Sequence, residues 1–294
     1  MYLESLSNWE MKPSNNITVV GGGFIGSSIF RLLSAEFQGN KIVMTKSSDL
    51  DLVEGVDPGD SLSELFSGSS TVVFSAALAP CRTKDEFSYN LSMIEPLLNV
   101  ADQVEHLVYI SSDAVYGDYV SPISEGSYCD PRGLHGLMHL TRERLILDTF
   151  KCPVAIVRPT LVYGVGDPHK GYGPNLFAQR IRNGEPIKLF GLGEELRDHV
   201  YVEDVARVVV ELVKGRMSGV VNAVSGSPLT FAEVAELLVK LSGSNTQVKT
   251  TPRSGPMPHG GYRTFAPSAI CNVVSGFRFV LPEIGFGSLV GSEN

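Results

Sequence analysis

Short apolar, β-rich runs alternate with helical patterns through the first two-thirds of the chain. This alternation is typical of βαβ units, in which helices cover both faces of a parallel sheet. It predicts an α/β fold with a Rossmann-type doubly wound parallel sheet, whose ligands bind at the carboxyl ends of the strands. The predicted strands are Ile17–Val20, Lys41–Thr45, Thr71–Ser75, His106–Ser111 and Val154–Arg158, and the predicted helices are Ile25–Glu36, Lys84–Val104 and Gly136–Phe150.

The alternation weakens after Arg158, where loops rich in Pro and Gly divide the chain into short pieces. We expect a dinucleotide-binding domain over residues 1–165 and, over residues 166–294, mainly a smaller C-terminal α/β lobe that binds substrate. Val200–Val213 has the pattern of a strand end followed by a helix, and residues 200–220 are expected to return to the first domain.

Composition and charge narrow the class of protein. No apolar run approaches the roughly 18 to 20 residues that span a bilayer, and Met1–Ser14 lacks the pattern of a secretory signal. We therefore expect a soluble, cytoplasmic protein without a membrane partner. The net charge of -8, with no basic stripe, argues against nucleic acid as a partner. The scattered cysteines Cys81, Cys129, Cys152 and Cys271 predict neither a disulfide framework nor a metal site.

The first predicted strand runs into G-x-G-x-x-G and then directly into a helix. Gly21 permits the tight turn, Gly23 lets backbone amides approach a pyrophosphate, and Gly26 lets the helix pack closely on the strand. The motif alone is weak evidence. Its place between a strand and a helix favours dinucleotide binding over a merely structural turn.

The end of the second strand bears on the choice of coenzyme. A carboxylate there would bind the ribose diol of NAD, but the chain reads Thr45-Lys46-Ser47. A cation with hydroxyls suits a 2′-phosphate, which favours NADP, with NAD as the alternative. A solvated loop with a chance lysine fits the same residues.

The chain resembles the extended short-chain dehydrogenase/reductase family, which contains nucleotide-sugar epimerases, dehydratases and reductases. The motifs that carry the resemblance extend over nearly the whole chain. They are Gly21-Gly-Gly-Phe24-Ile25-Gly26, Val73-Phe-Ser-Ala76-Ala77, Asn90, Val108-Tyr-Ile-Ser-Ser-Asp-Ala-Val-Tyr-Gly117, Arg158-Pro-Thr-Leu-Val-Tyr-Gly164, Gly173-Pro-Asn-Leu176 and Gly191–Ala206. The resemblance implies that Phe24, Ile25, Ala76, Ala77 and Asn90 belong to the cofactor site.

The resemblance also implies a catalytic and a substrate-binding set. Ser112 matches the catalytic Ser/Thr, and Asp113, which follows it, is expected to bind substrate. Asn175 and Arg197 match residues that contact the substrate diphosphate, and an arginine fork suits such an anion. A salt bridge of Arg197 with Asp198 or Glu203 is the alternative. Further phosphate contacts are expected from Arg253 and Arg263.

The family's Tyr-x-x-x-Lys pair is missing: His135 stands at the tyrosine position and His139 at the lysine position. Four residues apart on a helix, the two imidazoles share one face. Three interpretations stay open. His135 carries the proton in place of the tyrosine; catalysis has moved to Tyr128, Asp113 or Tyr163; or the protein only binds its ligands. A metal on the two histidines is disfavoured, because H-x-x-x-H lacks the glutamate of H-E-x-x-H.

Together these features predict an NAD(P)-dependent oxidoreductase or epimerase that acts on a nucleotide-diphosphate sugar by ketoreduction or epimerisation. A catalytically inactive dinucleotide- or nucleotide-sugar-binding regulator or scaffold is the alternative. The resemblance further implies a homodimer, formed through the helices that match Lys84–Val104 and Gly136–Phe150.

Overall fold

The computed structural model describes residues 3, 16–53, 58–66, 69–119, 122–169 and 171–291. Its centre is a six-stranded sheet of order β10-β5-β4-β3-β1-β2, in which each neighbouring pair is parallel. The predicted fold class is confirmed, and each predicted strand is present. The strands are β1 (Asn16–Val20), β2 (Ile42–Thr45), β3 (Ser69–Phe74), β4 (His106–Ile110), β5 (Val154–Pro159) and β10 (Gly219–Ala223), of which β10 was not predicted.

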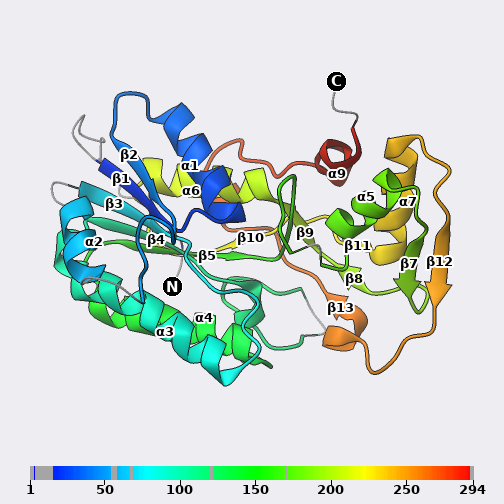
Figure 1. Cartoon of the computed structure of the whole chain (residues 1–294), viewed down its shortest axis with the longest axis horizontal. Coiled ribbons are helices and arrows are strands. Elements are labelled where there is room, and N and C mark those ends of the chain that lie inside the picture. The colour runs from blue at the N-terminus through cyan, green and yellow to red at the C-terminus, as the bar shows by residue number, and fades with distance from the viewer. Residues whose placement is uncertain are drawn as a thin grey trace.

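Helices cover both faces of this sheet (Figure 1). α1 (Phe24–Glu36) and α6 (Val202–Lys214) lie on one face. α2 (Pro58–Phe66), α3 (Lys84–Asn99) and α4 (Leu134–Thr149) lie on the other. Alternate residues of each strand enter one of two apolar cores. Burial on both faces explains why these strands read as continuous apolar runs.

The order of the strands fixes where a ligand can bind. β1 lies between β2 and β3, so that the connections from β1 to β2 and from β2 to β3 leave in opposite directions along the sheet. At such a switch point the loops diverge and leave a crevice beyond the carboxyl ends of the strands. The glycine turn follows β1 at this position.

One predicted helix is shorter in the structure, and one helix of the structure was not predicted. Lys84–Val104 was predicted as one helix, but α3 ends at Asn99 and a 3₁₀ turn follows at Ala101–Gln103. A capping box of Thr83 and Glu86 begins α3. α2 was missed, because its first residues, Pro-Gly-Asp, read as a turn.

The other half of the molecule contains short elements around its own aromatic core (Figure 1). Its helices α5 (Pro174–Arg182), α7 (Phe231–Ser242) and α9 (Pro282–Val290) pack on one another. β7 (Ile187–Phe190) pairs with β12 (Val248–Thr251). β8 (Leu196–Arg197) lies between β11 (Leu229–Thr230) and β13 (Tyr262–Arg263).

Two segments after residue 160 connect back to the first half. The strand predicted near Val200 is β9 (His199–Tyr201), which pairs with β6 (Leu161–Tyr163) rather than with the central sheet. α6 follows it and packs on α1. The short helix α8 (Ile270–Val273) places Ile270 in the core that α1 and α6 share.

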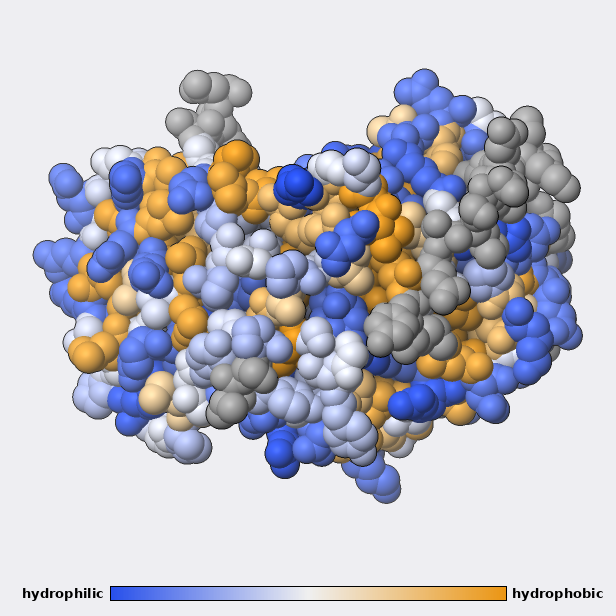
Figure 2. Space-filling view, turned by 180° about the vertical axis from the view of Figure 1, so that it is seen from behind, coloured by the Kyte–Doolittle hydropathy of each residue, from blue (hydrophilic) through white to orange (hydrophobic). Residues whose placement is uncertain are grey.

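Apolar side chains reach the surface in several separate places, and the outline dips between the two halves (Figure 2). Within the described ranges, no helix combines the length and the hydropathy that a membrane span requires.

His199 in β9 is a buried histidine in the aromatic core of the second half. Neither of its ring nitrogens has a hydrogen-bond partner among the described residues. Its ring packs edge-on against Phe231, with 5.6 Å between the ring centroids. Burial, with a smaller contribution from Arg197, lowers the pKa of His199 to about 3. The folded protein therefore holds His199 neutral where the unfolded chain is protonated.

This burial predicts a contribution of His199 to acid unfolding. Between pH 6.5 and about 3 the unfolded state binds a proton at His199 that the folded state does not bind. The free energy of unfolding therefore decreases as the pH falls through this range. In His199→Phe the slope of the free energy of unfolding against pH should be smaller by up to about 1.4 kcal/mol per pH unit. Urea unfolding between pH 4 and 7 measures it. His169→Phe, at an exposed position, is the control. Identical slopes for His199→Phe and the unmodified protein would contradict the prediction.

Candidate functional site

The turn after β1 has no room for side chains. Gly21 adopts φ +107°, and a Cβ on it would lie 2.6 Å from the backbone nitrogen of Ala76. A Cβ on Gly26 would lie 1.8 Å from the carbonyl oxygen of Gly21. Glycine is therefore required at both positions, one for the turn and one for the approach of α1 to β1.

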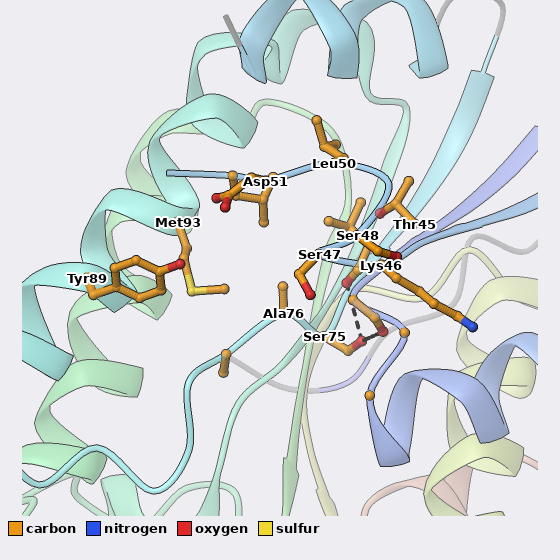
Figure 3. Close-up of a pocket in the computed structure, with 16 residues that line it drawn as sticks. Thr45, Lys46, Ser47, Ser48, Leu50, Asp51, Ser75, Ala76, Tyr89 and Met93 are labelled. Atoms are coloured by element: carbon orange, nitrogen blue, oxygen red, sulfur yellow. Dashed lines mark hydrogen bonds between the residues drawn. The ribbon is translucent and has the colours of Figure 1, made fainter. Parts of the chain in front are cut away.

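A pocket of about 410 Å³ opens beside this turn (Figure 3). The predicted residues Gly21, Gly23, Thr45, Lys46, Ser47, Ala76 and Ala77 line it. Sequence reasoning missed a second group, which consists of Leu50, Asp51 and Leu52 in the loop after β2 and Tyr89 and Met93 on α3. Tyr89 and Met93 are four residues apart on α3, a spacing that places them on one face and that the sequence offered as a signal.

In the loop after β2, Lys46 is not directed at the position predicted for a 2′-phosphate. Lys46 packs its stem toward Gly22, where a Cβ would lie 2.5 Å from Lys46 Cγ. Its ammonium group points away from Asp51 and Tyr89 (Figure 3). The carboxylate of Asp49 accepts hydrogen bonds from the Lys46 amide and the Ser48 hydroxyl, at 3.2 and 3.0 Å.

Asn90 lies behind the pocket. Its amide group exchanges two hydrogen bonds with the backbone of Leu78, each 2.9 Å long, and donates a third to the carbonyl of Glu86. The side chain is fully buried. Asn90 therefore holds the loop after β3 in place through its side chain.

Ser112 lies just beyond the carboxyl end of β4. It caps the short 3₁₀ helix Asp113–Val115, where its hydroxyl accepts from the amide of Ala114 at 3.1 Å. α4 begins directly against this turn, since a Cβ on Gly136 would lie 1.9 Å from the carbonyl oxygen of Ala114. The contact positions His135 next to the segment that carries Ser112.

The two histidines have different environments. His135 Nδ1 accepts a hydrogen bond from the Cys81 amide at 3.4 Å, so the neutral ring carries its proton on Nε2. Burial lowers the pKa of His135, partly opposed by Asp113. His139 lies behind it, edge-to-face at 4.8 Å between ring centroids, and its Nδ1 is 2.8 Å from the Tyr109 hydroxyl. Burial, with the neighbouring His135 and Arg142, holds the pKa of His139 well below its ordinary value.

The other candidates for proton transfer are differently placed. Tyr128 is 80% exposed. Tyr163 is buried in the second half, where its ring packs against Phe286 and burial raises its pKa. Asp113 is ion-paired with Arg263, with 2.7 Å between Oδ2 and Nε. Among the described residues, no group of three or more His, Cys, Asp or Glu side chains is arranged to hold a metal ion.

The predicted phosphate-binding arginines all have partners within the chain. Arg197 pairs with Glu195 at 2.8 Å and donates to the Pro258 carbonyl at 2.7 Å. The predicted alternative, a bridge to Asp198 or Glu203, is therefore wrong. Asp198 accepts from the amides of Ser225 and Gly226, and Glu203 pairs with Arg31.

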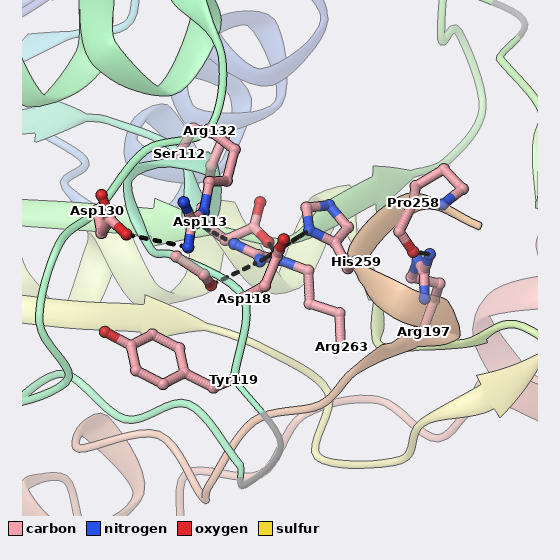
Figure 4. A network of polar contacts seen from close by, with 12 residues as sticks. Ser112, Asp113, Asp118, Tyr119, Asp130, Arg132, Arg197, Pro258, His259 and Arg263 are labelled. Atoms are coloured by element: carbon pink, nitrogen blue, oxygen red, sulfur yellow. Dashed lines mark hydrogen bonds and ion pairs between the residues drawn. The ribbon is translucent and has the colours of Figure 1, made fainter. Parts of the chain in front are cut away.

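Two further arginines belong to this region, and Figure 4 shows one of them, Arg263, beside Asp113 and His259. Arg253 also pairs with Glu195, which thus lies between two guanidinium groups. Arg263 reaches from β13 to Asp113 and to the carbonyl of Gly117 and so connects the two halves. Four residues before it, His259 pairs with Asp118 at 2.5 Å.

Asn175, at the start of α5, is also engaged locally. Its side chain accepts from the Gly164 amide at 3.1 Å and donates to the Gly164 carbonyl at 2.6 Å. Through these two hydrogen bonds it fixes the loop after β6.

The architecture is shared with solved structures. UDP-N-acetylglucosamine 4-epimerase from Bacillus cereus superposes with a TM-score of 0.80 at 21% identity, over 94% of this chain and 98% of that one. A GDP-L-fucose synthetase from Naegleria fowleri gives 0.78 at 18% identity, over 95% and 92%. UDP-glucuronic acid 4-epimerase from Bacillus cereus, in complex with UDP-glucuronic acid and NAD, gives 0.76 at 20% identity, over 94% and 98%. At these identities the likeness shows a shared fold.

The sequence itself carries the family assignment. The family model for NAD-dependent epimerases and dehydratases matches residues 17–223, which include the glycine turn, the pocket beside it, Ser112 and both histidines. The match covers more than half of the chain and ends with β10, the last strand of the central sheet. The protein belongs to the NAD-dependent epimerase/dehydratase family.

Proposed function

We propose that this protein is an NAD(P)-dependent enzyme that reduces or epimerises a nucleotide-diphosphate sugar. The observation that carries the proposal is the open space over Gly23 at the N-terminus of α1. A Cβ on Gly23 would meet no atom within 4 Å, in contrast to Gly21 and Gly26. Packing within the chain therefore does not explain this glycine, whereas the approach of a pyrophosphate to the backbone does.

The residues around Gly23 fit a dinucleotide. The first amides of α1, which include those of Phe24 and Ile25, have no acceptor within the helix and suit a pyrophosphate. The pocket beside the turn would hold the adenosine half between the loop after β2 and α3. The other half would extend past Ala77 toward Ser112 and His135. When bound, the coenzyme supplies the capacity to accept or donate a hydride.

Within this site we expect NAD to bind more tightly than NADP. The Lys46 ammonium points away from Asp51 and Tyr89, and Asp51 lines the pocket. A 2′-phosphate would approach the carboxylate of Asp51, whereas a free ribose diol can donate a hydrogen bond to such a group. The preference for NADP drawn from the Thr45-Lys46-Ser47 run is therefore reversed in this proposal.

At the reacting centre, the proposed roles fall to Ser112 and His135. The Ser112 hydroxyl can bind the sugar oxygen that changes between carbonyl and hydroxyl. His135 offers an Nε2–H donor to the same oxygen, since its Nδ1 is occupied by the Cys81 amide. For His135 to accept a proton at Nε2, its own proton must sit on Nδ1, so the hydrogen bond from the Cys81 amide to Nδ1 must break. His139, paired with Tyr109, acts on this site through the orientation of His135.

The substrate diphosphate would approach Arg197, Arg253 and Arg263 from the second half. Glu195 pairs with both Arg197 and Arg253, and Glu194 pairs with Arg253 at 3.9 Å, so a ligand phosphate would compete with these two carboxylates for the arginines. A ligand phosphate would replace the Pro258 carbonyl at Arg197. UDP-sugars are the ligands of solved family members of the same fold.

Gly23→Val tests the cofactor site directly. Because the space over Gly23 is open, the variant should fold as stably as the unmodified protein but lose NADH binding by at least about 100-fold, since the side chain fills the pyrophosphate position. Nicotinamide fluorescence and thermal unfolding measure the two quantities. Gly287→Val, at another glycine with open space, is the matched control. Retained NADH affinity in Gly23→Val would contradict the proposal.

Turnover of a panel of nucleotide sugars tests the activity. Ser112→Ala should lower kcat by about 100-fold, as the loss of one donor at a developing charge does in other enzymes. His135→Gln, which keeps an N–H donor, should retain more activity than His135→Phe. Ser34→Ala on α1 is the control, because Ser34 is exposed and remote from the site. A protein that binds NADH but turns over no nucleotide sugar would refute the catalytic assignment.

We further propose that the protein is a cytoplasmic homodimer joined through α3 and α4, which pack on each other. Leu134, Leu137 and Leu145 of α4 are 37 to 43% exposed, as expected for a face that a second copy covers. Leu137→Glu should yield a monomer by analytical ultracentrifugation. Leu192→Glu, at a 72% exposed leucine elsewhere, should leave the dimer intact. A monomeric unmodified protein at micromolar concentration would contradict this prediction.

A further inference from the structure

Glu195, the residue before β8, lies between two arginines of the second half. One oxygen of its carboxylate accepts a hydrogen bond from Arg197 Nη2 at 2.8 Å, and the other accepts from Arg253 Nη1. The Glu195 side chain is only 7% exposed. A buried carboxylate thus occupies the space between two guanidinium groups, where a ligand phosphate would bind both arginines at once.

The neighbouring Glu194 has a different role. Its carboxylate accepts from the amide of Leu192 at 2.8 Å and packs on Gly191, where a Cβ would lie 2.9 Å from Glu194 Oε2. Its contact with Arg253 is longer, at 3.9 Å. Within the described residues, the hydrogen bonds that the Glu195 carboxylate accepts come from the two guanidinium groups. Glu194 therefore shapes the turn at Gly191, whereas Glu195 serves the arginines.

The arginines need this carboxylate in the free protein. Burial lowers the pKa of Arg197, and the nearby charges of Arg263 and Arg253 lower it further. Glu195 is the strongest of the groups that oppose this effect, ahead of Asp113. A buried charge without a partner is costly, so cations gathered for a ligand require an anion whenever the ligand is absent. Glu195 supplies that anion from within the chain.

We propose that Glu195 is an internal competitor of the substrate, a carboxylate that occupies Arg197 and Arg253 until a ligand phosphate takes its place. The inference rests on the proposed binding of a nucleotide-diphosphate sugar. A phosphate oxygen is an anionic acceptor like a carboxylate oxygen, and an arginine fork suits either anion. The N–H groups that hold Glu195 are those that a phosphate between the two arginines would need, so binding breaks the contacts of Glu195.

The competition weakens substrate binding and favours release. Breaking the two contacts of Glu195 costs free energy that is subtracted from the binding of the phosphate. When the phosphate leaves, the carboxylate returns to the arginines and restores the buried pairs. Glu195 therefore acts on the affinity for the nucleotide and not on the chemistry at Ser112 and His135.

Isothermal titration calorimetry with UDP, GDP and dTDP measures the competition. Glu195→Gln removes the charge but keeps the size of the side chain. The nucleotide that binds the unmodified protein should bind this variant at least about tenfold more tightly, the equivalent of one charge-assisted hydrogen bond that the ligand no longer has to break. Without ligand the variant should unfold at a lower temperature, because Arg197 loses its charged partner. Loss of a carboxylate that only orients the arginines would instead lower both stability and affinity.

Glu185→Gln is the matched control. Glu185 pairs with Arg180 in the same half, so this variant makes the same change of net charge and breaks an ion pair outside the arginine cluster. Its affinity for the nucleotide should equal that of the unmodified protein. Equal or weaker binding by Glu195→Gln, or the same gain in Glu185→Gln, would overturn the proposal and leave the proposed function intact. Absence of binding of all three nucleotides by the unmodified protein and by Glu195→Gln would refute the proposed function itself.

A crystal structure of the unmodified protein with the bound nucleotide provides a test that needs no variant. Phosphate oxygens should lie at Arg197 Nη2 and Arg253 Nη1, and the Glu195 carboxylate should have moved away from both. A bound diphosphate beside intact contacts of Glu195 with both arginines would overturn the proposal.

Discussion

The close contact between the start of α1 and the exits of β1 and β3 is the constraint on which the site depends. Gly26 packs on the Gly21 carbonyl, and Gly21 packs on the backbone of Ala76. No side chain larger than hydrogen fits at Gly21 or Gly26 without moving the backbone. This contact fixes the height of the α1 N-terminus over the sheet and thereby the position of its unpaired amides. It also leaves the crevice beside Gly23 open, because the three segments meet without filling that space.

Buried charge organises the rest of the site. The Glu143–Arg158 pair joins α4 to β5, and Glu143 also accepts from the Ser111 hydroxyl at the end of β4. Arg263 joins the second half to the turn that Ser112 caps. Arg158 and Arg263 each have a carboxylate partner, so these two cations add no net positive charge to the site. Arg142, also buried, binds the carbonyl groups of Ala76 and Asn90 and lies at the Tyr109 hydroxyl.

Sequence reasoning predicted the central sheet because strands buried on both faces read as apolar runs of a typical length. β10 was not predicted, because it begins at a glycine and contains the buried Asn222. β8, β11 and β13 are each two residues long, too short for any periodicity. For the site, a local motif was sufficient to identify the glycine turn. The engagement of Asn90, Asn175 and Arg197 was not predictable, since Leu78, Gly164 and Pro258 approach them only in the folded chain.

Amide hydrogen exchange at the glycine turn shows whether the coenzyme binds there. The first amides of α1 have no acceptor within the helix in the free protein, and in the proposed complex they donate to the pyrophosphate of the coenzyme. Exchange at Phe24 and Ile25 should therefore slow markedly in saturating NADH, while the amides of α9 keep their rates. Unchanged exchange at Phe24 and Ile25 in protein that demonstrably binds NADH would show that the coenzyme lies elsewhere.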